Sequence, residues 1–563
     1  MSTMWYSLAV SALIAHDSFK RYETYAIRAH TALLLGPPTL ALGFLGSTGL
    51  SSQSVLHTLP LVYAAYLGAL TVYTILYRIS PFHPLAQYPG PLGCKVSQWW
   101  MACKSWSGYE HLYISELHHK YGDVVRIGPN ELSIRDASAI SPIMSIAKGP
   151  QYVGRMLSDG IHLPIIGIQD PAEHLRRRRP WNRAFTVPAL RGYEETIARR
   201  ARQLVDALER HNGGQVILGK WFNYFAYDFM CDMAFGGGSE LLQERDNSNV
   251  WRVLDEGMKV GTLLAHVPWL GVYLSHIPLA TGALDILISH CRMLTTQRVQ
   301  RGATQKDLFH YLNDEDLANS SEKPRAQPPL RQLTDDGCLI VVAGADTTSS
   351  ALTSLFYCLL TNPETYRRLQ DEVDKFYPRG EDTFDVRYHR EMRWLNAVIY
   401  ETLRLFPPVP GGSQRRVPHN SAGVMAGDAF IPPGTSVWAH TWSIHRDPRN
   451  FSRPDAFWPD RWLLASTTLG SFPSSASSSA EADGVRDFVH NEDAWIPFAQ
   501  GQMNCVGKNL ALLEIRMVVC ALMQRFEMRL SEGWDAREYE WKFRAYLVAT
   551  RPEMPVRLRV RCT

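Results

Sequence analysis

Cys505 stands in a short loop whose neighbours favour a reactive thiolate. Gly501 and Gly507 bracket it, and an apolar-periodic helix is predicted directly after it, over 509–525. The free N–H groups and positive dipole end of a helix stabilise a thiolate. Glycines let the backbone pass close to a flat ligand, and Phe498 supplies a ring that can shield the sulfur. The alternative is a buried structural cysteine at the start of a helix.

Residues 496–511 read IPFAQGQMNCVGKNLA and resemble the haem-binding signature of the cytochrome P-450 family. The match runs through the phenylalanine, the two glycines and the cysteine of this loop. It implies haem b with Cys505 as the axial thiolate, a ligand that promotes O–O cleavage. Met503 departs from the family pattern, which usually has Arg or His there to pair with a haem propionate.

A second candidate site interrupts the long apolar stretch 339–360. A membrane span is disfavoured there because the carboxylate of Asp346 would be costly in the bilayer. In a soluble core it still needs partners, so an acid beside two threonines indicates a hydrated kink. Residues 343–348 resemble the family's oxygen-activation motif. The resemblance implies that Gly344 leaves room for dioxygen and that Thr347 donates a hydrogen bond to it. Asp346 would pass protons from solvent, a role worth about 10²–10⁴-fold in rate.

Glu401 and Arg404 lie three residues apart on a predicted helix, 394–405, where they can pair. An exposed pair of this kind contributes little. The context makes this pair more significant. Together with the Pro-rich end of the helix and the stretch FWPDRW at 457–462, it resembles the family's Glu-x-x-Arg and Pro-x-Arg elements. The resemblance implies that Arg461 completes a buried triad behind the haem and shapes the cysteine loop.

Four consecutive arginines, residues 176–179, follow closely on His174. A solvated basic face is the general interpretation of such a run. By spacing, His174 and Arg178 occupy positions where the family usually has Trp and Arg facing the haem propionates, and guanidinium binds carboxylate in a bidentate way. Arg416, or its neighbour Arg415, is the other candidate propionate partner.

The N-terminal region is strongly apolar. The run from Thr58 to Tyr77 carries no charge, and as a helix of about 30 Å it could cross a hydrocarbon core. The stretch 31–50 is a weaker candidate because Gly-Pro-Pro interrupts it, and 4–15 is too short. A signal peptide is disfavoured because charged residues precede the long run, which lies deep in the chain. We expect a membrane-anchor region over 1–80 with one span, or two.

A Pro-rich hinge, 81–92, leads into a single predicted domain, 93–563, that is mainly α with small β-sheets. The Ser-rich stretch 463–483 and the segment 318–330 are predicted surface insertions. The resemblance to the family implies that 153–168, 342–345 and 409–412 line a substrate cavity, which is expected to be chiefly apolar. The predicted helices are 192–211, 247–264, 335–360, 363–376, 394–405 and 509–525, and the predicted strands are 124–127, 131–134, 427–431 and 436–439.

Composition excludes several classes of protein. The 563 residues carry a net charge of only +3, which gives no reason to expect a nucleic-acid partner. The nine cysteines show no CxxC spacing, so neither a zinc ribbon nor a disulfide framework is indicated, and reduced thiols facing the cytosol are expected. The sequence has no flavin or nicotinamide fingerprint, which implies electrons from a separate NADPH–P-450 reductase.

The resemblance extends from about residue 88 to the C-terminus. It implies the cytochrome P-450 fold behind one or more anchor helices, and a haem-thiolate monooxygenase that inserts one oxygen atom of O2 into an apolar small molecule. It further implies the endoplasmic reticulum membrane, a cytosolic catalytic domain and fungal secondary metabolism, with terpenoids as the expected substrates. One alternative is an isomerase or dehydratase without reductase, against which Asp346 and Thr347 argue. The other is a non-catalytic haem-binding membrane protein.

Overall fold

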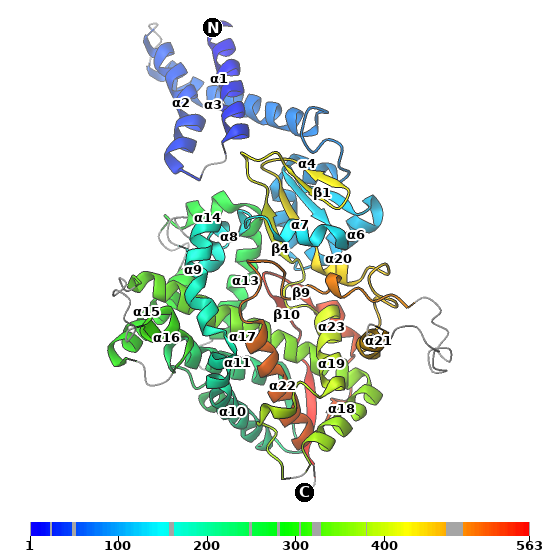
Figure 1. Ribbon diagram of the computed structural model, residues 1–563. Coiled ribbons are helices and arrows are strands. Elements are labelled where there is room, and N and C mark those ends of the chain that lie inside the picture. Colours follow the sequence, from blue (N-terminus) through cyan, green and yellow to red (C-terminus); the bar gives the residue numbers. More distant parts are fainter. Residues whose placement is uncertain are drawn as a thin grey trace.

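The computed structural model describes residues 2–22, 25–47, 52–156, 163–246, 250–277, 282–302, 306–317, 328–378, 380–468 and 488–561. Helices account for most of this part of the chain, and its strands form four small sheets (Figure 1). The predicted class, mainly α with small β-sheets, is confirmed.

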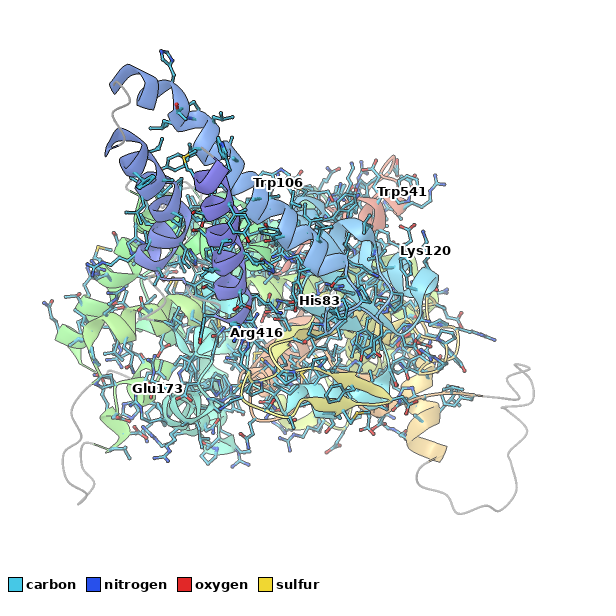
Figure 2. All side chains as sticks on the ribbon, turned by 90° about the horizontal axis from the view of Figure 1, so that it is seen from above. His83, Trp106, Lys120, Glu173, Arg416 and Trp541 are labelled. Atoms are coloured by element: carbon cyan, nitrogen blue, oxygen red, sulfur yellow. The ribbon has the colours of Figure 1, made fainter. Side chains whose placement is uncertain are left out.

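Three N-terminal helices pack around a small core of their own and project from the rest of the molecule (Figure 1). They are α1 (Ser2–Arg21), α2 (Ile27–Ser47) and α3 (Ser52–Ile79). The Tyr66 hydroxyl of α3 donates to the Leu33 carbonyl of α2 at 2.6 Å. Figure 2 looks down on these helices. The sequence predicted one or two spans in this region. The structure forms three helices, and the first, whose apolar stretch was expected to be too short to span, packs along α3.

Two helices among the described residues are long and apolar enough to cross a membrane. In the first, His57–Ile79, only 17% of the apolar window is buried. In the second, Leu330–Thr361, 72% of the window is buried. An apolar helix enclosed by protein has the character of a core helix, whereas an apolar surface left open is suited to lipid. Of the two, the first is therefore the candidate anchor.

Helices of the remaining chain form the bulk of the molecule. They are α4 (Leu92–Val96), α5 (Gln98–Trp106), α6 (Glu110–Tyr121), α7 (Ile140–Met144), α8 (Gln151–Gly154), α9 (Pro171–Ala184), α10 (Val187–Glu209), α11 (Leu218–Phe235), α12 (Leu241–Glu244), α13 (Val250–His266), α14 (Pro268–Leu274), α15 (Gly282–Arg301), α16 (Leu308–Leu312), α17 (Leu330–Thr361), α18 (Pro363–Phe376), α19 (Arg393–Leu405), α20 (Thr441–His445), α21 (Asp460–Thr468), α22 (Lys508–Arg525) and α23 (Arg537–Lys542).

The largest sheet has the strand order β1-β2-β7-β4, in which β2 and β7 are parallel and the other neighbours antiparallel. The other sheets are β3-β11-β8, β5-β6 and β9-β10. The strands are β1 (Val124–Gly128), β2 (Glu131–Ile134), β3 (Gln215–Ile217), β4 (Ser413–Arg416), β5 (Val424–Ala426), β6 (Ala429–Ile431), β7 (Ser436–Ala439), β8 (Phe526–Leu530), β9 (Arg544–Ala545), β10 (Ala549–Thr550) and β11 (Pro555–Val560).

The long helix α17 runs through the main core and packs closely along α11. Aromatic side chains fill this contact, with the rings of Phe222 and Phe356 5.4 Å apart. Two glycines bring the helices together: a Cβ on Gly337 would lie 2.6 Å from the Phe235 ring, and one on Gly344 would lie 2.5 Å from Met230. This packing fixes α17, and with it the acid–alcohol motif.

Each predicted helix and strand has a counterpart within a few residues of its expected ends. One prediction was partly wrong. The Ser-rich stretch 463–483 was expected to be an insertion from its first residue, but 463–468 belong to α21, where Ala465 is buried. Residues 469–483 lie outside the described part of the chain, as do 318–327 of the other predicted insertion.

Candidate active site

Cys505 lies just before the first turn of α22, in a loop closed by its own backbone. Its N–H donates to the Phe498 carbonyl at 2.9 Å. The residue is exposed, yet desolvation by the protein around it raises the pKa of the thiol. The backbone N–H groups of Gly507 and Lys508 and the charge of Arg178 act in the opposite direction without overcoming it. Both observations fit a side chain that lines an internal space.

This result corrects one expectation. The helix terminus alone was predicted to favour the Cys505 thiolate, whereas desolvation outweighs it and favours the neutral thiol. A bound metal cation reverses that balance, because a coordinating thiol is deprotonated outright. The loop is therefore suited to become charged when it acquires a metal centre.

One stripe near the middle of α17 is accessible and lies next to a part of the helix that is fully enclosed. Ala343 is exposed and Gly344 and Thr347 are half-buried, whereas residues 348–359 are buried without interruption. The Thr347 hydroxyl donates to the Ala343 carbonyl at 2.7 Å, and the helix is continuous through the motif. Helices α17 and α22 also pack together, which brings this stripe and the cysteine loop onto neighbouring elements.

Asp346 is buried and forms an ion pair that the sequence did not reveal. Its carboxylate accepts a hydrogen bond from Arg551 at 3.0 Å, and both side chains are only 6% exposed. Arg551 also donates to Asn223 and Ser349, so it is fixed from three sides. Burial raises the pKa of Asp346, and Arg551 offsets part of that rise. Burial followed by the nearby Asp346 charge raises the pKa of Asp255 to about 6.

Glu401, Arg404 and Arg461 meet in the core, each with a fully buried side chain. Arg404 donates to both oxygens of Glu401 at 2.8 and 2.9 Å, and Arg461 donates to Oε1 at 3.1 Å. Burial alone would raise the pKa of Glu401, but the two arginines outweigh it and hold the pKa below its ordinary value. The carboxylate is therefore charged and shared.

His445 connects this triad to the cysteine loop. Its Nδ1 bonds to the Arg404 carbonyl at 2.9 Å, and its Nε2 accepts from the N–H of Ile496 at 2.9 Å. A carbonyl only accepts and an N–H only donates, so the ring carries its proton on Nδ1. Burial lowers the pKa of His445 to about 3, which keeps the ring neutral. Through His445, the triad thus holds the backbone at Ile496, nine residues before Cys505.

A cluster of cations is buried near the loop without an anion. Lys148, His174 and Arg415 are 7%, 3% and 0% exposed. Burial is the main cause that lowers the pKa of Lys148 far below its ordinary value, and Arg415 lowers it further. The pKa of His174 falls to about 4 from burial and then the charge of Lys148. His174 Nε2 and two nitrogens of Arg415 have no hydrogen-bond partner.

No carboxylate among the described residues pairs with Lys148 or Arg415. Buried charges are normally paired, so the cluster fits an anionic group from outside the chain, such as the two propionates of haem b. Arg178 donates to the backbone and side-chain oxygens of Asn504 at 3.0 and 3.1 Å, beside the cysteine. The residues present therefore fit the cofactor.

The structure also separates the two arginines of β4. Arg415 belongs to the cationic cluster, where it forms a β-bridge with Lys148. Arg416 is half-buried on the opposite face of the strand, and its N–H donates to Ala147. Arg415 is therefore the better candidate of the two. Sequence reasoning missed Lys148, since a single lysine before Gly-Pro carries no motif.

Gly344 has a role in packing that was not expected. A Cβ there would meet Met230 of α11, so the absence of a side chain permits the close approach of two helices. The predicted room for dioxygen stays a prediction.

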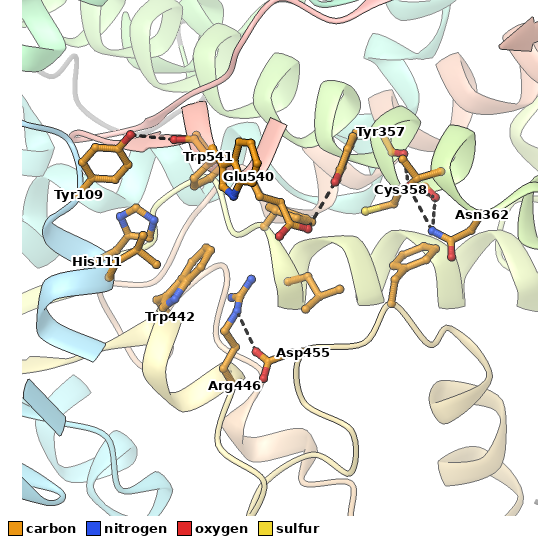
Figure 3. A pocket seen from close by; sticks show the side chains of 16 residues that line it. Tyr109, His111, Tyr357, Cys358, Asn362, Trp442, Arg446, Asp455, Glu540 and Trp541 are labelled. Carbon is orange, nitrogen blue, oxygen red and sulfur yellow. Dashed lines mark hydrogen bonds and ion pairs between the residues drawn. The ribbon is translucent and has the colours of Figure 1, made fainter. Parts of the chain in front are cut away.

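A separate cavity of about 670 Å³ lies between α6, α20, α23 and the C-terminal end of α17 (Figure 3). Aromatic side chains line it, and the Tyr109 hydroxyl donates to the Trp541 carbonyl at 2.8 Å across one edge. The pair Arg446–Asp455, with its charged atoms 3.6 Å apart, also lines it. None of the predicted site residues lines this cavity, so it is not the candidate active site.

Comparisons with known proteins agree with this geometry. The family model for cytochrome P-450 matches residues 93–554. The cytochrome P-450 monooxygenase FCK2 of Fusarium pseudograminearum is 32% identical over 483 residues, which cover 84% of this chain and 81% of the relative. Tryprostatin B 6-hydroxylase of Aspergillus fumigatus is 29% identical, over 94% of this chain and 92% of the relative. This chain therefore belongs to the cytochrome P-450 family of oxygen-incorporating oxidoreductases.

Proposed function

We propose that this protein is a membrane-anchored monooxygenase that binds haem b through the Cys505 thiolate and inserts one oxygen atom of O2 into an apolar small molecule. One observation carries the proposal: an accessible cysteine before α22 lies near a buried cationic cluster that lacks its anion. A haem provides both an iron for the sulfur and two carboxylates for the cations.

Each group of residues in the site would have its own role. Lys148, His174, Arg178 and Arg415 would hold the propionates, and the triad around Glu401 would keep the cysteine loop in shape. The haem, when bound, supplies the oxygen-activating chemistry. The Thr347 hydroxyl, which belongs to the accessible stripe of α17, would hold a proton at Oγ1, and the neighbouring Asp346 carboxyl would supply that proton. Asp346 must first be released from Arg551, which holds it in the resting structure.

The electron source and location are also proposed. The described residues contain neither a flavin nor a nicotinamide fold of their own, and the family generally uses a redox partner, so NADPH–P-450 reductase is the proposed donor. The open apolar surface of His57–Ile79 supports an anchor in the endoplasmic reticulum membrane with residues 93–563 in the cytosol. The fungal relatives support secondary metabolism, and terpenoids stay a prediction from the sequence alone.

The test is NADPH-dependent oxidation by the full chain in membranes, with and without added reductase. Products heavier than the substrate by one oxygen atom, formed only with both NADPH and reductase, are expected from an apolar substrate panel. The variant Thr347→Ala should continue to consume NADPH while forming less product, because proton supply falls. Turnover without reductase, with rearranged or dehydrated product, would instead favour the isomerase or dehydratase alternative.

A further inference from the structure

Arg155 is a half-buried cation for which the described residues supply no counter-ion. It follows α8 directly, inside the segment 153–168 that was predicted to line the substrate cavity. Its guanidinium carbon lies 4.3 Å from the centre of the Tyr152 ring, and its buried Nε has no hydrogen-bond partner. Burial lowers the pKa of Arg155, and no described carboxylate offsets that effect. A buried guanidinium nitrogen without an acceptor is unfavourable, so an acceptor from elsewhere is expected there.

The surroundings of Arg155 place it where three elements meet. A Cβ on Gly271 of α14 would lie 2.1 Å from the Gly154 carbonyl, so α8 and α14 are in backbone contact. A Cβ on Gly261 of α13 would lie 2.8 Å from Leu547 and 3.8 Å from the Cβ of Arg155. Figure 1 shows α8, α13 and α14 together, with the β9–β10 hairpin that carries Leu547 beside them.

More basic side chains lie near the candidate site than the two propionates of a haem can pair with. Lys148 lies within electrostatic range of Arg155, Arg178 and Arg415, which makes four basic side chains, and His174 is neutral because its pKa is about 4. Two propionates would neutralise two of the four. Arg178 donates to Asn504 and therefore lies at the cysteine loop, and Lys148 and Arg415 form a β-bridge. Arg155 is the member of the four that follows α8, the element that packs against α13 and α14.

We propose that Arg155 binds a carboxylate of the substrate, and that the substrates of this enzyme are therefore apolar carboxylic acids. The inference rests on the proposed function, since it takes the haem site as the place of reaction. A guanidinium already stacked on Tyr152 presents its N–H groups in a fixed plane, which suits bidentate binding of a carboxylate. The carboxylate would hold one end of the molecule at α8 and leave its apolar part to reach the accessible stripe of α17.

The experiment measures binding to the haem-loaded full chain through the shift of the Soret band that a substrate causes. The probes are two matched pairs, dodecanoic acid with its methyl ester and indole-3-butyric acid with its methyl ester. For at least one pair the wild type should bind the acid about 10–100-fold more tightly than the ester, the range expected for a hydrogen bond between charged groups. Arg155→Gln should abolish the preference, and Arg155→Lys should keep part of it.

The matched control is Arg252→Gln on α13, whose side chain is 72% exposed and whose loss should leave the preference unchanged. Equal binding of acid and ester by the wild type in both pairs would overturn the inference, as would a preference that survives Arg155→Gln. Loss of haem in Arg155→Gln would also overturn it, because Arg155 would then belong to the propionate partners. Failure of the proposed function itself is distinguishable, because the wild type would then bind no thiolate-ligated haem at all.

Discussion

Replacement of Glu401 by glutamine should destabilise the fold more than any change of similar size at the surface. The variant Glu401→Gln keeps the shape of the side chain but removes the negative charge between Arg404 and Arg461. All three side chains are fully buried, and the carboxylate accepts hydrogen bonds from both guanidinium groups at 2.8 to 3.1 Å. Neither arginine can reach water without opening the core, so both charges would stay buried and uncompensated.

Loss of one partner from a buried ion pair lowers the free energy of unfolding by about 3–5 kcal/mol. Because two arginines share this carboxylate, we expect Glu401→Gln to fall in the upper half of that range, about 4–5 kcal/mol. The cysteine loop should be affected as well, since Arg404 contacts His445 and His445 contacts Ile496. Haem release should therefore precede global unfolding in the variant.

The assay is urea unfolding of the haem-loaded full chain in detergent, followed by tryptophan fluorescence for the fold and by the Soret band for haem. The control is Glu553→Gln, which breaks the surface pair with Lys220, whose side chains are 64% and 55% exposed. That change should lower the free energy of unfolding by less than about 1 kcal/mol. Equally small losses of unfolding free energy in both variants would refute the reasoning, because the charge of Glu401 would then contribute no more stability than an exposed ion pair does.

Four further predictions concern the site and its surroundings. Asp346→Asn should retain haem but lower the rate of product formation by about 10²–10⁴-fold, measured as product per haem, and an unchanged rate would remove Asp346 from proton delivery. Lys148→Met should lose haem several-fold faster on dilution than wild type. Met503→Arg should hold haem at least as well as wild type, and a clear loss would contradict its alignment with a propionate. Burial alone would lower the pKa of His266, but Glu110 at 2.9 Å outweighs it and raises that pKa above 6.5. The stabilisation that the charged His266–Glu110 pair gives is therefore complete below pH 6.5 and is lost as the pH rises through the raised pKa. The variant His266→Gln should remove this pH dependence, so its urea unfolding midpoint should change less across that range than that of the wild type.

The sequence predicted those elements whose pattern repeats along the chain. Helices α18, α19 and α22 begin and end within a residue of their predicted ends, because an apolar stripe and a proline or glycine mark them. Helix α11 was missed for a physical reason. Most of its residues are buried, so it lacks the polar face on which the period of 3.6 residues depends.

The motifs predicted which residues carry chemistry, but not their partners. Glu401 and Arg404 share one helix turn, so their pairing could be expected from spacing. Arg551 bonds to Asp346 although the two lie 205 positions apart in the sequence, and Lys148 forms a β-bridge with Arg415, which is also distant in the sequence. Such contacts depend on how distant elements pack, and a single arginine or lysine leaves no local signal for them. The raised pKa of the Cys505 thiol likewise depends on surrounding protein that sequence spacing does not reveal.

The central claim is that Cys505 binds haem iron as a thiolate. Its most direct test is the carbon-monoxide difference spectrum of the reduced full chain in membranes, recorded beside Cys505→Ala. We expect the strongly red-shifted Soret band of thiolate-ligated haem in the wild type and its loss in the variant. A band at the position of histidine-ligated haem, or well-folded wild-type protein that binds no haem, would contradict it.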